Sequence, residues 1–443
     1  MIDITAAPFT LDADAAEWVH TTLAGMDLRA KVGQLFHLVC RANDAEGIRR
    51  VLDVATPNGF MLRALPAADV VSVARLVQDA APIPMLLSAD VERGANGLYV
   101  EGTSFASAMQ VAATGDVAFV KAVESRGMAT APKHFPGDGV DDRDQHLVTS
   151  VNRMSVAEWD ESFGKVYRDV IDAGARSIMV GHIGLPECSK ALRPGIADSD
   201  ILPASMSEEL LSGLLRDRLG FNGVIVSDSL RMVGFTVPMR RSDALPLIVE
   251  AGIDVLLFAS DFATDVDFVL AGIENGVLSM RRVDEAVTRI LALKASLGLH
   301  TKSPTELVPG LEVLAELPLD EHRAWSKDTA QHAVTLVKNL EPGVLPLDPS
   351  RHKRILVYYT EDSNPNHHKI AEGDKRANNG HIVANQLTEA GFDVTVFERE
   401  GRATMDDVNA GRDAVPYARL ITDYDLVLYA LRRIFVRSVP QSR

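Results

Sequence analysis

The sequence predicts an α/β protein, a (β/α)8-type TIM barrel followed by a smaller α/β domain. The first observation is that short apolar runs, typical of buried parallel strands, alternate with amphipathic segments of helical length over residues 33–298. The second is that these units extend over about 270 residues, close to the roughly 250 residues of such barrels. Strands that are apolar throughout are buried on both faces of their sheet, and in a barrel the helices bury one of these faces.

Seven apolar runs can be assigned as barrel strands, one fewer than the fold requires. They are residues 33–39, 59–63, 84–90, 129–135, 177–183, 223–229 and 254–260. Amphipathic segments predict helices over residues 156–174, 204–220 and 284–298. A leading helical segment is expected over residues 10–32, with Thr10 as its N-cap.

The chain after the barrel has a different composition. Residues 301–350 are rich in Pro and Leu and predict a linker with a helix over 324–339. A second α/β domain is expected over residues 351–443, with barrel residues 1–300 before the linker. Its predicted elements are a strand at 354–360, a helix at 380–391 and strands at 393–398 and 425–431. So few strands predict a partial, truncated sheet, which ends in an arginine-rich segment at 432–443.

Charge and cysteine content exclude several classes of protein. Lys and Arg number 45 against 61 Asp and Glu, a formal net charge of −16, which provides no basic surface for nucleic acid or anionic lipid. Two cysteines, Cys40 and Cys188, cannot form a disulfide framework or a cysteine-based zinc site. No apolar run reaches the about 18 residues of a membrane span, and acids occupy the positions of a secretory signal's positive charges. We expect a cytoplasmic protein with neither nucleic acid nor membrane as partner.

Ionisable residues stand at the carboxyl ends of four apolar runs. They are Asp90, the pair Lys133 and His134, His182 and Asp228. In a parallel barrel these ends face one rim, where active sites lie. A single Asp after a strand is equally explained as the N-cap of the next helix, and a single His as a hydrogen-bonded structural residue. Four strands that end in this way favour a functional site.

The loop after the fourth run is the densest group of acids in the chain. Residues 138–146 contain four aspartates and His146, but they have neither the regular oxygen-ligand spacing of a calcium loop nor paired zinc ligands. No metal or other cofactor is therefore predicted. Asp144 lies two residues before His146, so its carboxylate can hold one imidazole nitrogen while the other moves a proton. A solvated acidic loop explains the pattern equally well.

Three segments together resemble glycoside hydrolase family 3, in its branch of β-N-acetylglucosaminidases. They are KHFPGDG at 133–139 with the following D-x-H, MVGHI at 179–183 and GVIVSDSLRM at 223–232. The resemblance extends over nearly the whole chain. It implies a retaining glycosidase that removes terminal β-linked N-acetylglucosamine without a cofactor.

The resemblance also implies roles for the candidate residues. Asp228 corresponds to the nucleophile, and His146 with its partner Asp144 corresponds to the general acid/base. The residues implied to bind sugar hydroxyls are Lys133, His134 and Asp90. His182 matches the family's strand-end histidine, here grouped with the substrate-binding residues.

Alternatives to hydrolysis of an N-acetylglucosaminide remain open. A β-glycoside phosphorylase is reasonable because a neutral histidine repels an attacking phosphate less than a carboxylate does. A β-glucosidase would use the same residues. An inactive sugar-binding remnant is the alternative of a different class.

The chain departs from the family pattern between its third and fourth apolar runs. The family places a further strand and an arginine-containing loop there, whereas here a short segment joins the two runs between Asp116 and Met128. One βα unit, about 30 residues or more, is therefore expected to be missing. Asp138 and Ser229 stand where other members carry His and Asp.

Overall fold

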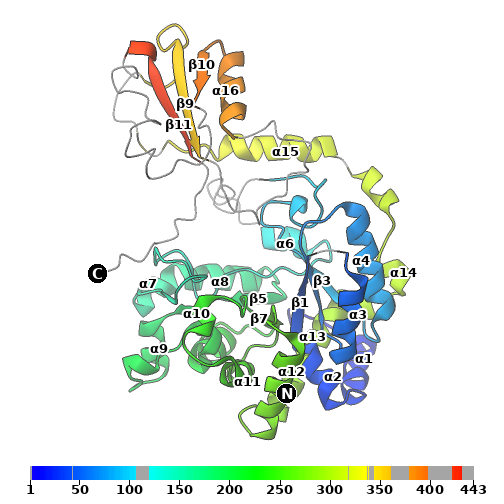
Figure 1. Cartoon of the computed structure of the whole chain (residues 1–443). Coiled ribbons are helices and arrows are strands. Elements are labelled where there is room, and N and C mark those ends of the chain that lie inside the picture. The colour runs from blue at the N-terminus through cyan, green and yellow to red at the C-terminus, as the bar shows by residue number, and fades with distance from the viewer. Residues whose placement is uncertain are drawn as a thin grey trace, which may run out of the picture. The chain divides into compact units, whose positions relative to one another are not determined.

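The computed structural model describes residues 2–41, 43–105, 119–317, 319–336, 338, 344–360, 379–397 and 422–431 (Figure 1). The chain divides into two compact units, Met1–Val334 and Thr335–Arg443. Every ladder between named strands is parallel. The predicted α/β class with parallel sheets is confirmed.

Most strands of the first unit follow one continuous order. A four-stranded sheet has the order β3 (Leu86–Ser88), β2 (Gly59–Leu62), β1 (Phe36–Cys40) and β8 (Leu256–Leu257). A parallel bridge between Val226 and Val255 continues this order to β7 (Val224–Ser227), which pairs with β5 (Ser177–Val180). A further bridge joins Val180 to Phe135.

The order has two ends, β3 and the segment at Phe135. β8 lies beside β1 although about 200 residues separate them, so the last strand of the unit pairs with the first. In the described part of the chain, no ladder or bridge joins β3 to the Phe135 segment. A short pair formed by β4 (Ser150–Val151) and β6 (Ile183–Gly184) completes the strands of this unit.

Helices follow the strands of the first unit, and several of them, such as α3, α4, α11 and α12, lie beside the strands (Figure 1). Their bounds are α1 Ala13–Ala24, α2 Leu28–Gln34, α3 Ala45–Val54, α4 Ala67–Ala80, α6 Phe119–Glu124, α7 Val156–Glu161, α8 Phe163–Asp172, α9 Pro186–Leu192, α10 Val233–Thr236, α11 Arg241–Ala251, α12 Phe262–Glu274, α13 Met280–Ser296, α14 Pro304–Leu307 and α15 Leu319–His332. Strands and helices pack into one large apolar core, in which Phe36, Ile178, Val224 and Leu256 are fully buried.

The leading helical segment differs from its prediction. It forms two helices, α1 and α2, and the second takes up Gly33 and Gln34, which were expected to begin a strand. Asp12, and not Thr10, is the first N-cap, because its carboxylate accepts the Ala15 N–H at 2.9 Å. Thr10 lies outside the helix with φ of 50°.

Two other predicted elements take a different form. Residues 129–135 contribute an isolated bridge at Phe135 and no regular strand. Residues 204–220 form a 3₁₀ turn, η3 (Ala204–Met206), and a π-helix, η4 (Glu209–Arg218), where an α-helix was expected. The apolar periodicity of four buried leucines predicted a helix, but spacing alone does not separate the i→i+5 from the i→i+4 hydrogen-bond pattern.

The second unit contains a parallel sheet in its described residues. The strand order is β10 (Asp393–Val396), β9 (Arg354–Thr360) and β11 (Leu426–Leu431), and α16 (Asn379–Glu389) connects β9 to β10. Ile355, Val357 and Phe392 form its buried core. The arginine-rich segment 432–443 lies outside the described residues. None of the helices in the described parts of the chain combines the length and apolar character that crossing a bilayer requires.

A buried carboxylate fastens the amino-terminal ends of β7 and β8. Asp254 is fully buried, and its oxygens accept hydrogen bonds from Arg282 at 2.7 Å, from Arg216 at 2.6 Å and from the Ile225 N–H at 2.9 Å. Burial alone would raise the pKa of Asp254, but Arg282, Arg216 and Arg289 lower it below its usual value. The carboxylate is therefore ionised and joins η4, β7, β8 and α13.

We predict that Asp254→Asn destabilises the first unit by about 3–5 kcal/mol, because it leaves buried arginines without their counter-charge. Denaturant unfolding of the purified chain measures this. The control is Asp267→Asn, which removes an exposed partner of Arg29 and should cost at most about 1 kcal/mol. A loss of less than 1 kcal/mol for Asp254→Asn would contradict the role given to this carboxylate.

Candidate active site

The carboxyl ends of β5 and β7 bring Asp228 beside His134. The Asp228 N–H donates to the Val180 carbonyl at 2.8 Å, and Val180 also bridges to Phe135. His134, directly before Phe135, therefore lies with its Nε2 3.5 Å from Oδ2 of Asp228. Parallel strands thus place two of the predicted residues together although 94 positions separate them.

The Asp228 carboxylate is buried and only half satisfied. The residue is 8% exposed, and its Oδ1 accepts the Ser229 N–H at 2.7 Å. Its Oδ2 is buried and makes no hydrogen bond with any described residue. Because a buried oxygen without a partner is costly, the arrangement leaves this oxygen available to a bound molecule.

His134 is held between two carboxylates. Its Nδ1 lies 3.1 Å from Oδ2 of Asp138, on the side of the ring away from Asp228. The hydrogen bond from His134 lowers the pKa of Asp138, although partial burial opposes this. Asp138 therefore orients the imidazole, a role that its position in the sequence did not predict.

A second group of charges lies around the end of β3. Lys133 forms an ion pair with Glu92, and Asp90 forms one with Arg63, which follows β2. Burial alone would lower the pKa of Lys133, but Glu92, and more weakly Asp90 and Asp228, raise it above its usual value. Lys133 is therefore a cation at neutral pH, and its charge is felt at Asp228.

His182 is buried, with both ring nitrogens occupied inside the protein. Nε2 lies 3.0 Å from the Ser229 carbonyl and Nδ1 2.8 Å from the Ser205 hydroxyl. Because a carbonyl only accepts, Nε2 carries the proton and Nδ1 accepts from Ser205. Burial lowers the pKa of His182, so the ring is neutral at pH 7. Through Nε2, His182 thus contacts Ser229, the residue directly after Asp228.

Asp144 and His146 pair on the loop as their spacing suggested. Nδ1 of His146 lies 2.7 Å from Oδ1 of Asp144, and the imidazole side chain is 64% exposed. The Val233 N–H donates to the His146 carbonyl at 3.2 Å, and the Gly234 N–H donates to the Gln145 carbonyl at 3.2 Å. The loop therefore lies against α10, a few residues after Asp228.

Several residues around the site were not predicted from the sequence. They are Arg63, Glu92, Gln145 and Ser205, together with Asp138 in its orienting role. Glu92 follows Asp90 by two positions and Gln145 precedes His146, so proximity to a predicted residue was the one signal available. Ser205 comes from a distant turn, and no sequence pattern connects it to His182.

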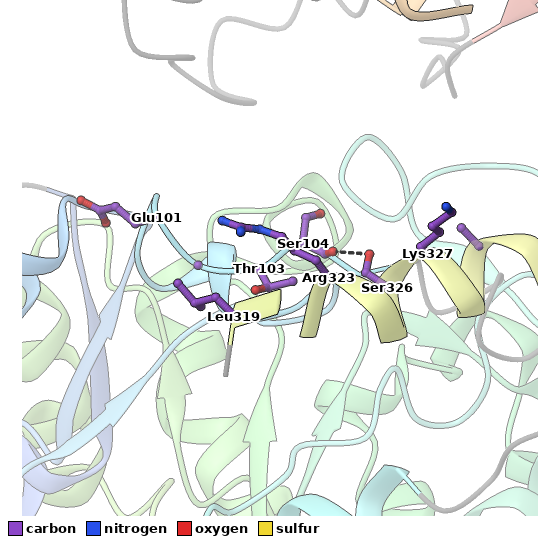
Figure 2. Close-up of a pocket in the computed structure, with 9 residues that line it drawn as sticks. Glu101, Thr103, Ser104, Leu319, Arg323, Ser326 and Lys327 are labelled. Carbon is purple, nitrogen blue, oxygen red and sulfur yellow. Dashed lines mark hydrogen bonds between the residues drawn. The ribbon is translucent and has the colours of Figure 1, made fainter. Parts of the chain in front are cut away.

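A cavity of about 390 Å³ lies elsewhere on the first unit (Figure 2). Its wall combines residues 101–104 with side chains of α15, including Arg323 and Lys327, and the Ser326 hydroxyl donates to the Ser104 carbonyl at 2.7 Å. None of the predicted site residues lines it. The cavity is therefore separate from the predicted site residues.

Known proteins share both the sequence and the fold of this chain. Residues 102–293 match the model of the glycosyl hydrolase family 3 N terminal domain. A beta-N-acetylglucosaminidase/beta-glucosidase from Cellulomonas fimi is 43% identical over 479 residues, an alignment that covers 94% of this chain and 83% of that protein. The chain belongs to glycoside hydrolase family 3. The family resemblance found in the sequence is confirmed, and this family member is a glycosidase.

Other family 3 relatives cover different shares of the chain. Beta-hexosaminidase A from Pseudoalteromonas piscicida is 30% identical over 58% of this chain and 44% of its own length. A solved beta-glucoside phosphorylase matches with a TM-score of 0.82 and 30% identity, over 97% of this chain and 84% of its own. A family 3 beta-N-acetylglucosaminidase from Paenibacillus sp. shares the fold, with a TM-score of 0.71 at 22% identity over 91% and 84% of the two chains.

Proposed function

We propose that this family 3 glycosidase is a retaining enzyme that removes terminal β-linked N-acetylglucosamine from glycans or cell-wall fragments. The observation that carries the proposal is the buried Asp228 carboxylate, whose Oδ2 has no hydrogen-bond partner among the described residues. The 43% identity to a protein named as both a beta-N-acetylglucosaminidase and a beta-glucosidase supports N-acetylglucosamine as the sugar, with glucose as the other sugar in that name. The substrate is thus a carbohydrate.

In the proposed first step, a carboxylate oxygen of Asp228 attacks C1 of the sugar. The bond from C1 to the aglycone oxygen breaks, and that oxygen takes a proton from His146, so an ester links the sugar to Asp228. In the second step, water attacks C1 and gives a proton to His146, while Asp228 leaves as a carboxylate. Asp144 holds Nδ1 of His146, which directs Nε2 to both proton transfers.

The charged residues around Asp228 are proposed to bind the sugar. Lys133 and Asp90 present a cation and a carboxylate, and His134 a ring nitrogen, to its hydroxyls. His182 supports them through the Ser229 carbonyl. Because Lys133 stays charged, its hydrogen bonds to hydroxyls persist across the neutral pH range.

A phosphorylase is the second candidate, in which phosphate replaces water in the second step. The likeness to a solved beta-glucoside phosphorylase favours it, as does a histidine in place of an acid/base carboxylate. Product analysis of reactions with and without phosphate separates the candidates, because only a phosphorylase forms the sugar 1-phosphate.

We further propose that the first unit is a TIM barrel that lacks its fourth βα unit. The strand order supports this, because its two ends, β3 and the Phe135 segment, flank the position of that unit. The alignment with the Cellulomonas fimi protein is consistent with this, since it extends over 479 positions although it includes only 94% of this 443-residue chain, so the relative has additional residues within the aligned region. Part of the expected join, residues 116–118, lies outside the described residues.

Asp228→Ala should lower kcat by at least about a thousandfold, because it removes the group that bonds to the sugar. Hydrolysis of p-nitrophenyl β-N-acetylglucosaminide measures the rate, and an unchanged Tm shows that the fold is kept. A mechanism-based fluorosugar should label Asp228 in the unmodified enzyme. Labelling of another carboxylate would overturn the assignment.

His146→Ala should slow glycosylation by substrates with poor leaving groups about a hundredfold more than by activated aryl glycosides, since only the former need protonation. Asp144→Asn should act in the same direction more weakly, because it disturbs the imidazole tautomer. Pre-steady-state rates on a series of aryl glycosides check both. Equal losses on every leaving group would exclude His146 as the acid.

Insertion of a complete family-type βα unit before Phe119 should raise Tm by roughly 4 °C or more and also raise kcat/KM, because it pairs two strand edges. The matched control is a Gly/Ser linker of equal length at the same position, which supplies no strand. Calorimetry and aryl glycoside hydrolysis compare the two proteins. Equal Tm values would contradict the proposed gap.

A further inference from the structure

Gln145 is a buried side chain in an otherwise exposed part of its loop. It is 3% exposed, whereas Asp144 before it is half-buried and His146 after it is exposed. Its Oε1 accepts the His182 N–H at 2.8 Å, and its Nε2 donates to Oδ2 of Asp138 at 3.3 Å. Both ends of the amide are therefore used.

These two contacts connect the loop to Asp228 by separate routes. On one side, Gln145 binds the His182 backbone, the His182 ring binds the Ser229 carbonyl, and the Ser229 N–H binds Asp228. On the other, Gln145 binds Asp138, which binds the ring of His134, whose Nε2 lies 3.5 Å from Asp228. Asp138 begins the same loop, so the amide ties the part of the loop next to His146 both to Asp138 and to the His182 backbone.

Two glycines make room for this anchor. A Cβ atom on Gly181 would lie 2.9 Å from Oε1 of Gln145, and one on Gly234 would lie 2.8 Å from its carbonyl oxygen. The close approach of the Gln145 backbone therefore requires glycine at position 234 in α10, and Gly181, directly after β5, leaves room for the amide oxygen where it now lies. Contacts with these neighbouring segments therefore fix both the backbone and the side chain of Gln145.

We propose that Gln145 is a positioning residue that fixes His146 relative to Asp228. The inference rests on the proposed function, in which His146 is the general acid/base. Without the amide, the segment next to His146 keeps its backbone contacts to α10 but loses its side-chain hydrogen bonds to Asp138 and to the His182 backbone, which lead to Asp228. A reacting group misplaced by about 1 Å can cost a hundredfold in rate. A displaced His146 would therefore slow the two proton transfers.

The test compares Gln145→Met with Asp142→Asn on aryl β-N-acetylglucosaminides of graded leaving-group ability. Methionine fills a similar volume but makes neither hydrogen bond. If Gln145 served only to fill space, the Gln145→Met variant would behave like the unmodified enzyme. Asp142 is exposed in the same loop and serves as the matched control. His146→Ala and the double variant complete the set, and calorimetry records Tm for each.

We expect Gln145→Met to lower kcat/KM about 10- to 100-fold on poor leaving groups and less than about 3-fold on activated ones, with Asp142→Asn unchanged. In the His146→Ala background, Gln145→Met should add less than about 3-fold. The positioning role is overturned if Gln145→Met lowers kcat/KM equally on all leaving groups. It is also overturned if the variant has its full effect in the His146→Ala background. If His146→Ala itself shows no leaving-group dependence, the proposed function has failed instead, and the two failures are distinguishable.

Discussion

Parallel pairing of the strands is the constraint on which the candidate site depends. It directs every strand's carboxyl end to the same edge, so residues separated by about a hundred positions meet there. The bond from the Asp228 N–H to the Val180 carbonyl is the clearest instance, because it joins the ends of β5 and β7 where Asp228, His134 and His182 gather. A pairing shifted by one residue would turn Asp228 to the opposite face of its strand.

The two ends of β7 and β8 treat a buried carboxylate in opposite ways. Asp254, at the amino-terminal ends, has hydrogen bonds on both oxygens and arginine counter-charges. Asp228, at the carboxyl end, keeps one buried oxygen that accepts no hydrogen bond from the described residues, with Nε2 of His134 3.5 Å away. Full satisfaction stabilises a fold, whereas an unsatisfied oxygen costs stability and is kept where a ligand can use it. The contrast separates a structural acid from the proposed nucleophile without reference to relatives.

The acid/base proposal concerns an exposed residue whose neighbour in the chain is buried. His146 is exposed and paired with Asp144, yet its neighbour Gln145 is buried and joined to both sides of Asp228. Exposure allows the imidazole to reach substrate and solvent for its two proton transfers, and the buried amide limits where the loop can lie. Both properties are needed for one group to serve as acid and then as base.

The sequence by itself determined the α/β class and the family, because apolar spacing and local motifs can be read along the chain. It suggested the pairing of Asp144 with His146, with a solvated acidic loop as the equal alternative, and the structure shows the pair. The strands at 59–63, 177–183 and 223–229 were predicted to within a few residues, and the second unit's strand at 354–360 was predicted over its full length. Tertiary structure alone decided that Asp138 orients His134, that Ser205 and Ser229 occupy both nitrogens of His182, and that Gln145 joins the loop to Asp228. It also decided the π-helix η4 and the single bridge at Phe135. These contacts join residues from separate elements, and which side chains meet depends on strand register and loop packing, which local spacing does not encode.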